Sequence, residues 1–177
     1  MKKKNKGFGS NIFISDETKE VLETGGGIKK AAWFFKEEKE PFVVINVDVL
    51  TDMNLNDIIS QHKKNNPLAT LAVTSRTTSR YFLFDDLDHL CGWENELTGV
   101  QKISRESKEY RKKAFSGIHI ISPEIFSLIK LKNKFSIVDV YLELAKTYTI
   151  AAFDHSNSKF IDVGKPENLL KAEEMFG

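Results

Sequence analysis

Cysteine is almost absent from this sequence. Cys91 is the only cysteine among 177 residues. An intrachain disulfide needs two cysteines and a cysteine-based zinc cluster needs more, so both are excluded. A lone thiol also suits a reducing compartment. These features predict a protein of the cytoplasm that is held together by its packed core.

An excess of one charge is absent as well. Lysine and arginine number 26 and aspartate and glutamate 25, which gives a net charge of +1. No overall field therefore favours nucleic acid or an anionic membrane. No apolar run approaches the length of a membrane span, about 20 residues, and the basic start leads into Gly7 and Gly9 rather than a signal-peptide core. We expect one domain, residues 1–177, with no nucleic-acid and no membrane partner.

Short apolar runs alternate with amphipathic patterns along the chain. Residues 28–38 show the helical pattern, because Ile28, Ala31 and Phe35 recur at the spacing of one helix face. Strands are expected at residues 11–15, 42–48, 68–75, 80–84, 115–121, 149–153 and 159–163, the last two as a pair. The alternation predicts a three-layer α/β domain.

The run from Phe42 to Ile45 is the most informative strand. It is continuously apolar and rich in β-branched residues, as in a strand covered on both faces. Asn46 and Asp48 follow directly, where the strand leaves the sheet. Ligands bind at this carboxyl end in open α/β sheets. We interpret Asp48 as a metal-binding carboxylate at a nucleotide site.

Asp162 is a second strand-end carboxylate. It closes a short strand that leads into Gly164 and a helix started by Pro166. Two such aspartates could share one Mg²⁺, which prefers one or two carboxylates together with substrate phosphates and water. The spacing alone leaves open that Asp48 and Asp162 are unrelated.

Glycines mark two further candidate contacts. Gly25, Gly26 and Gly27 precede the expected helix, where a glycine run exposes backbone N–H groups to a ligand; a flexible connector is the alternative. Gly117 interrupts an apolar strand, which indicates a bulge or a close approach. Four residues lie where acceptor contacts could be made, although we interpret them as surface or core residues: Arg76, Arg80, Trp93 and Asn95.

Four segments in order resemble the sugar-phosphate nucleotidyltransferases, the NDP-sugar pyrophosphorylase family. They are residues 22–28 (LETGGGI), 42–48 (FVVINVD), 115–126 (FSGIH followed by SPEIF) and 160–167 (FIDVGKPE). More narrowly they resemble its bacterial members of the mannose-1-phosphate guanylyltransferase and N-acetylmuramate-1-phosphate uridylyltransferase type. Four motifs in sequence are far more specific than one.

The resemblance implies a Rossmann-like nucleotide-diphospho-sugar transferase fold with a mixed sheet. It also implies that a nucleoside triphosphate and a sugar 1-phosphate are joined to a nucleotide-sugar with release of pyrophosphate, using Mg²⁺. Asp48 and Asp162 would take the catalytic and metal-binding positions. Gly117 would meet the sugar. The nucleotide would be bound by Glu23, Thr24, Gly25, Gly26 and Asn46.

Three departures from the family pattern change the expectation. Val47 replaces a usual glycine, Lys165 replaces a usual threonine, and the Gly-x-Gly-Thr-Arg loop that grips the triphosphate is not found. We therefore expect an N-terminally truncated domain with an open edge beside the strand that ends at Asp48, and little turnover. A non-catalytic nucleotide-sugar-binding module and a glycosyltransferase of related fold are the alternatives. A homo-oligomer is compatible with the sequence.

Overall fold

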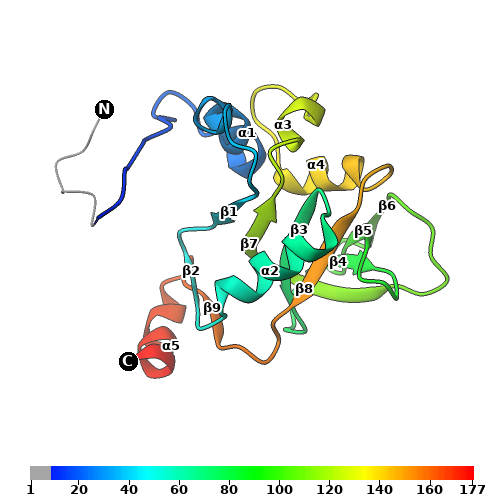
Figure 1. Ribbon diagram of the computed structural model, residues 1–177. Coiled ribbons are helices and arrows are strands. Elements are labelled where there is room, and N and C mark those ends of the chain that lie inside the picture. Colours follow the sequence, from blue (N-terminus) through cyan, green and yellow to red (C-terminus); the bar gives the residue numbers. More distant parts are fainter. Residues whose placement is uncertain (1–8) are drawn as a thin grey trace.

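The computed structural model describes residues 9–177, and its centre is a mixed sheet of seven strands. Six strands lie in the order β6-β5-β4-β7-β3-β8, and β1 also pairs with β7 (Figure 1). The bounds of these strands are β1 Phe42–Ile45, β3 Ala69–Thr74, β4 Arg80–Phe84, β5 Leu90–Asn95, β6 Val100–Ile103, β7 Arg111–Ile121 and β8 Ile150–Asp154. A separate antiparallel pair is formed by β2 Val49–Thr51 and β9 Phe160–Asp162.

Helices cover both faces of the sheet, which confirms the predicted three-layer α/β class. On one face, Ile58 packs on Ala72, Ile118 and Ile120. On the other, Tyr141 and its neighbours pack in the larger core cluster with alternate residues of β3. Strand alternation explains the division, since successive side chains point to opposite faces. The helices are α1 Glu23–Lys30, α2 Leu55–Asn65, α3 Ile125–Leu128, α4 Ile137–Leu144 and α5 Glu167–Phe176, with the 3-10 helix η2 Ala31–Phe35.

The long strand β7 joins the two halves of the sheet. Its first residues pair with β4, and its later residues pair with β3 on one side and β1 on the other. Within the part that pairs with β3, Gly117 has a φ of +72° and the register with β3 shifts. The bulge predicted at Gly117 is therefore present.

Strand β1 has one partner within residues 9–177. Asn46 N donates to Gly117 O at 2.9 Å, so by strand alternation the backbone groups of Val43 and Ile45 point away from β7. The side chains of Val43 and Ile45 are exposed. The sequence-based expectation of an open edge at this strand is met in the described part of the chain.

Three sequence-based assignments differ from the structure. Residues 11–15 form no strand. Helix α1 begins at Glu23, five residues before the expected start, and gives way to η2 after Lys30. The predicted pairing of residues 149–153 with 159–163 is wrong, because β8 pairs with β3 and β9 with β2.

No helix among residues 9–177 is long and apolar enough to cross a bilayer. The single-domain organisation stays a prediction.

Candidate functional site

Three strands of the sheet end at the same edge. Strands β1 and β3 are both antiparallel to β7, and β8 is parallel to β3, so all three point the same way. The residues that follow them are Asn46 after β1, Arg76 after β3 and His155 after β8. Because ligands of α/β sheets bind outside these carboxyl ends, this edge is the candidate site.

The structure brings Asp48 and Asp162 together beside Gly164. A Cβ atom placed on Gly164 would lie 2.9 Å from Asp48 Oδ2 and 3.0 Å from Asp162 Oδ1. The two carboxylate oxygens are therefore no farther apart than the sum of these distances. Two carboxylate oxygens that both reach within about 3 Å of one point offer the hard donors that a small divalent cation prefers.

Backbone contacts hold the two aspartates in this arrangement. Val163 N donates to Asp48 O at 2.8 Å, and Gly164 N donates to Asp162 Oδ1 at 2.8 Å. Asn168, from the first turn of α5, donates to Asp162 O at 2.7 Å. Within residues 9–177 no group of three or more His, Cys, Asp or Glu side chains could hold a metal. A cation between Asp48 and Asp162 would thus need further ligands from substrate and water.

Asn46 and Gly117 adjoin the two aspartates on the sheet side. A Cβ atom at Gly117 would lie 2.7 Å from Asn46 Nδ2, so only glycine leaves room for this amide. The positive φ at Gly117 favours glycine for a second, independent reason. The structure therefore gives Gly117 a role in placing Asn46, while the predicted contact with a sugar stays a prediction.

Sequence reasoning gave no role to His155, which lies at the same edge. Its Nε2 is 2.7 Å from Ser116 Oγ, both side chains are buried, and Nδ1 has no hydrogen-bond partner in the described part of the chain. Burial lowers the pKa of His155, and the carboxylates of Asp154 and Asp52 oppose that shift. The rule that singled out Asp48, a polar residue just after a strand, would also have found His155.

An ion pair between Lys113 and Asp154 lies next to His155. Lys113 Nζ contacts Asp154 Oδ2 and donates to Ser75 Oγ at 2.8 Å. Partial burial acts to raise the pKa of Asp154, but hydrogen bonds from Lys113 and Ser156 outweigh it and hold the pKa below its usual range. Lys113 therefore already has an anionic partner.

The glycines at the start of α1 differ from the expected ligand loop. Gly25 and Gly26 are buried inside the helix, and Gly26 N donates to Phe135 O at 3.2 Å. Cβ atoms at these positions would lie 2.6 Å from Phe135 Cδ2 and 2.5 Å from Asn133 O. The expectation that these glycines form an open loop with free N–H groups was wrong, because they let the helix pack closely on another segment.

Glu23 and Thr24 remain exposed at the same helix start. Figure 1 shows α1 apart from the β2–β9 pair, with β1 between them. The structure thus brings Asn46, Asp48, Gly117 and Asp162 together and leaves the 23–26 segment separate. Contact of that segment with a nucleotide stays a prediction.

Replacing Gly25 by alanine tests the packing role. The added methyl group meets backbone and ring atoms of Phe135, so we expect a loss of about 1–3 kcal/mol in the free energy of unfolding. Gly27→Ala is the matched control, because there the methyl group meets only the end of the Glu17 side chain and alanine favours a helix by about 0.5–1 kcal/mol. Urea unfolding measures both. Equal stability of the two variants would contradict the packing role.

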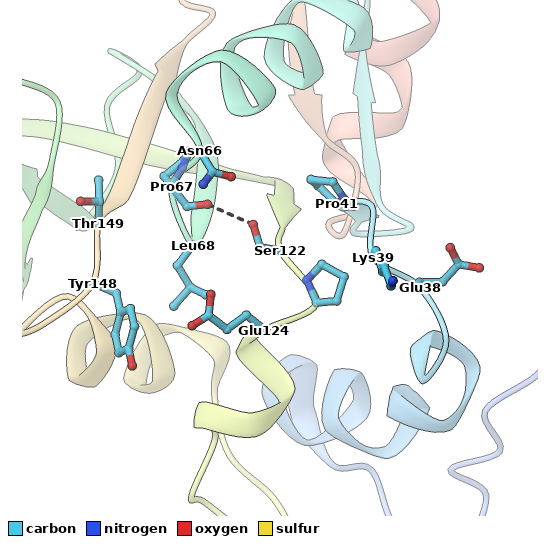
Figure 2. A pocket seen from close by; sticks show the side chains of 11 residues that line it. Glu38, Lys39, Pro41, Asn66, Pro67, Leu68, Ser122, Glu124, Tyr148 and Thr149 are labelled. Carbon is cyan, nitrogen blue, oxygen red and sulfur yellow. Dashed lines mark hydrogen bonds between the residues drawn. The ribbon is translucent and has the colours of Figure 1, made fainter.

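A separate cavity of about 520 Å³ lies at the opposite edge of the sheet. Figure 2 shows Pro41, Leu68 and Thr149 around it, residues that precede β1, β3 and β8. Ser122 Oγ donates to Pro67 O at 3.0 Å across its wall. This cavity faces the amino ends of the strands and is distinct from the edge that carries Asp48 and Asp162.

Sequence relatives were found over nearly the whole chain. A mannose-1-phosphate guanyltransferase of Yarrowia lipolytica is 30% identical over 175 residues, which are 96% of this chain and 45% of that protein. Mannose-1-phosphate guanyltransferase 2 of Candida glabrata is 27% identical over 178 residues, 99% of this chain and 47% of that protein. The chain thus spans about half the length of these relatives.

Solved structures agree on the fold. HddC from Yersinia pseudotuberculosis, complexed with GMP-PN, matches with a TM-score of 0.63 and 25% identity over 90% of this chain and 64% of that one. UTP-bound UGPase from Acinetobacter baumannii matches with a TM-score of 0.69 over 88% of this chain and 56% of that one; at 16% identity it supports the Rossmann-like fold alone. The family model described as Nucleotidyl transferase matches residues 2–176, and this chain belongs to that family.

Proposed function

We propose that this chain carries the sugar-phosphate side of a sugar-1-phosphate nucleotidyltransferase site, with Mg²⁺ held by Asp48 and Asp162. The observation that carries the proposal is the approach of both carboxylates to one point beside Gly164. These carboxylates come from segments more than a hundred residues apart and have hard oxygen donors, as Mg²⁺ prefers.

The reaction needs no protein nucleophile. An oxygen of the sugar phosphate forms a bond to the α-phosphorus of the nucleoside triphosphate, while the bond to the β-phosphate oxygen breaks and its electron pair leaves with pyrophosphate. A bound Mg²⁺ supplies neutralisation of the phosphate charge. Asp48 and Asp162 would fix the position of that charge. The bond from Gly164 N orients the Asp162 carboxylate, and the bond from Val163 N holds the main chain at Asp48.

The neighbouring residues would orient the substrates. Asn46 presents a side-chain amide beside Gly117, and amides can both donate to and accept from sugar hydroxyls or phosphate oxygens. Glu23 and Thr24 are exposed for contacts with the nucleotide at the other side of β1. Positioning of this kind supplies a large part of the acceleration of phosphoryl-transfer reactions.

Pyrophosphate release tests the proposal. The relatives are named mannose-1-phosphate guanyltransferases, so GTP and mannose 1-phosphate are the first substrate pair, followed by UTP, CTP and dTTP with the same sugar phosphate. We expect weak, Mg²⁺-dependent release that requires both substrates, because the Gly-x-Gly-Thr-Arg loop that grips the triphosphate is not found in this sequence. Calorimetric titration with GDP-mannose in Mg²⁺ is run in parallel to measure binding of a product directly.

The two rival functions give different results in the same assays. Binding of GDP-mannose without pyrophosphate release would favour a non-catalytic nucleotide-sugar-binding module. Transfer of mannose from GDP-mannose to an acceptor, again without pyrophosphate, would favour a glycosyltransferase. If the protein neither binds GDP-mannose nor releases pyrophosphate in the presence of Mg²⁺, the proposed function is refuted.

A further inference from the structure

Arg76 is fixed at the candidate site by contacts with two of its strands. It follows the carboxyl end of β3, and its guanidinium lies over the Phe160 ring with Cζ 5.3 Å from the ring centroid. Nη2 donates to Phe115 O at 3.1 Å. Phe160 belongs to β9 and Phe115 to β7, so the cation is held between the strand of Asp162 and the strand of Gly117.

The position of Phe160 relates Arg76 to the paired carboxylates. Phe160 and Asp162 are two residues apart in β9, so their side chains point to the same face of the strand. Two residues of a strand span about 7 Å. The guanidinium over Phe160 therefore lies beside the strand that carries Asp162.

Most hydrogen-bond donors of Arg76 have no acceptor within residues 9–177. A guanidinium has five N–H donors, and one contact, to Phe115 O, is made within residues 9–177. No ion pair in that part of the chain includes Arg76. By contrast, Arg111 pairs with Asp88 and also donates to Asp85 O. A guanidinium stacked on an aromatic ring keeps its edge free for two parallel bonds to a phosphate or carboxylate.

We propose that Arg76 binds the phosphate of the sugar 1-phosphate, on the side of that group away from Asp48 and Asp162. The inference rests on the proposed function of the same site. Two carboxylates repel a phosphate, and a single divalent cation leaves the two carboxylates and the phosphate together with a net negative charge. Arg76 adds a positive charge in a place where Lys113 is already paired with Asp154. Stacking on Phe160 and the bond to Phe115 O limit its rotamers, which lowers the entropy lost on binding.

Calorimetric titration with α-mannose 1-phosphate in Mg²⁺ tests the role of Arg76. Arg76→Met keeps the apolar stem over Phe160 and removes the charge, and we expect affinity to fall about 10- to 100-fold. Arg76→Lys should recover part of the loss, because an ammonium keeps the charge without the fork. Arg105→Met, in the loop after β6 at the far edge of the sheet, is the matched control and should bind as the wild type.

Two further measurements separate binding from structure. The affinity of the wild type should fall more steeply with added salt than that of Arg76→Met, and inorganic phosphate should compete with mannose 1-phosphate in the wild type only. Unchanged thermal midpoints show that the variants fold. A folded Arg76→Met that binds mannose 1-phosphate as tightly as the wild type, while both still bind GDP-mannose, overturns the inference and leaves the proposed function standing. A wild type that binds neither ligand overturns both.

Discussion

Replacing Asp48 by asparagine should lower the affinity for a divalent cation by more than about 100-fold, because loss of even an outer-shell partner of a metal ligand costs about 10- to 100-fold. Asparagine keeps the size of the side chain and removes its charge. Asp162→Asn should have a similar effect, since both carboxylates reach the same point beside Gly164. Titration with Mn²⁺, followed by electron paramagnetic resonance, measures the free ion directly and does not depend on turnover.

The double variant and a control sharpen this prediction. If both carboxylates share one cation, Asp48→Asn combined with Asp162→Asn should lose about as much binding free energy as either single variant, and clearly less than the sum of the two single losses, because one change already destroys the site. Asp86→Asn, the same substitution in the exposed β4–β5 turn, should leave Mn²⁺ binding unchanged. Retained tight binding in Asp48→Asn would remove the metal role from this pair.

Lowering the pH from 7 to 5 should destabilise the protein by about 3–4 kcal/mol. Burial lowers the pKa of His119 to about 3 and that of His62 to about 4, from 6.5 in the unfolded chain. Below pH 6.5 the imidazoles of His62 and His119 bind protons in the unfolded state, whereas in the folded state they stay neutral. Stability is therefore full above pH 6.5 and falls as the pH drops toward 4, by up to about 1.4 kcal/mol per histidine and pH unit.

The packing around these histidines explains why they stay neutral. His119 contacts the Tyr141 hydroxyl between β7 and α4, and its Nε2 has no partner in the part of the chain that the structure describes. His62 lies between Thr70 Oγ1 at 2.8 Å and Ser122 Oγ at 3.1 Å. Neither site offers a carboxylate among these contacts to compensate a positive charge.

Urea unfolding at pH 5, 6, 7 and 8 measures the effect. A variant that combines His119→Phe with Tyr141→Phe removes one titrating histidine without orphaning the tyrosine hydroxyl, so its loss of stability between pH 7 and 5 should be about half that of the wild type. Between pH 7 and 8 both proteins should change little from this cause. A wild type as stable at pH 5 as at pH 7 would show that the buried histidines do not govern acid stability.

The sequence alone predicted the elements whose pattern is local. The β-branched run before Asn46 and Asp48 is a strand, Asn54 caps α2 through its side chain, and Ser136 caps α4 in the same way. Such features depend on neighbours a few residues away, so they can be read without the fold. The four family motifs likewise lie in consecutive residues, which is why the family could be recognised.

The glycine run predicted the position of a close approach correctly but its partner incorrectly. Gly25 and Gly26 do stand where two parts of the chain approach closely, but the partner is the segment around Phe135 rather than open space for a ligand. A glycine run shows only that there is no room for a side chain. Which group occupies that space depends on residues more than a hundred positions away.

Tertiary structure alone decided how the site is assembled. The sequence contains Asp48, Asp162 and four arginines but does not show which of them meet. Pairing of β2 with β9 places the two carboxylates beside Gly164. The Phe160 ring in β9 and the Phe115 carbonyl in β7 contact Arg76 and so distinguish it from the other arginines. The sequence determined which strands end in polar residues, since strand formation and chain exit are local. Their convergence at one edge depends on strand order and register, which arise from packing between distant segments and leave no mark on any single stretch of the chain.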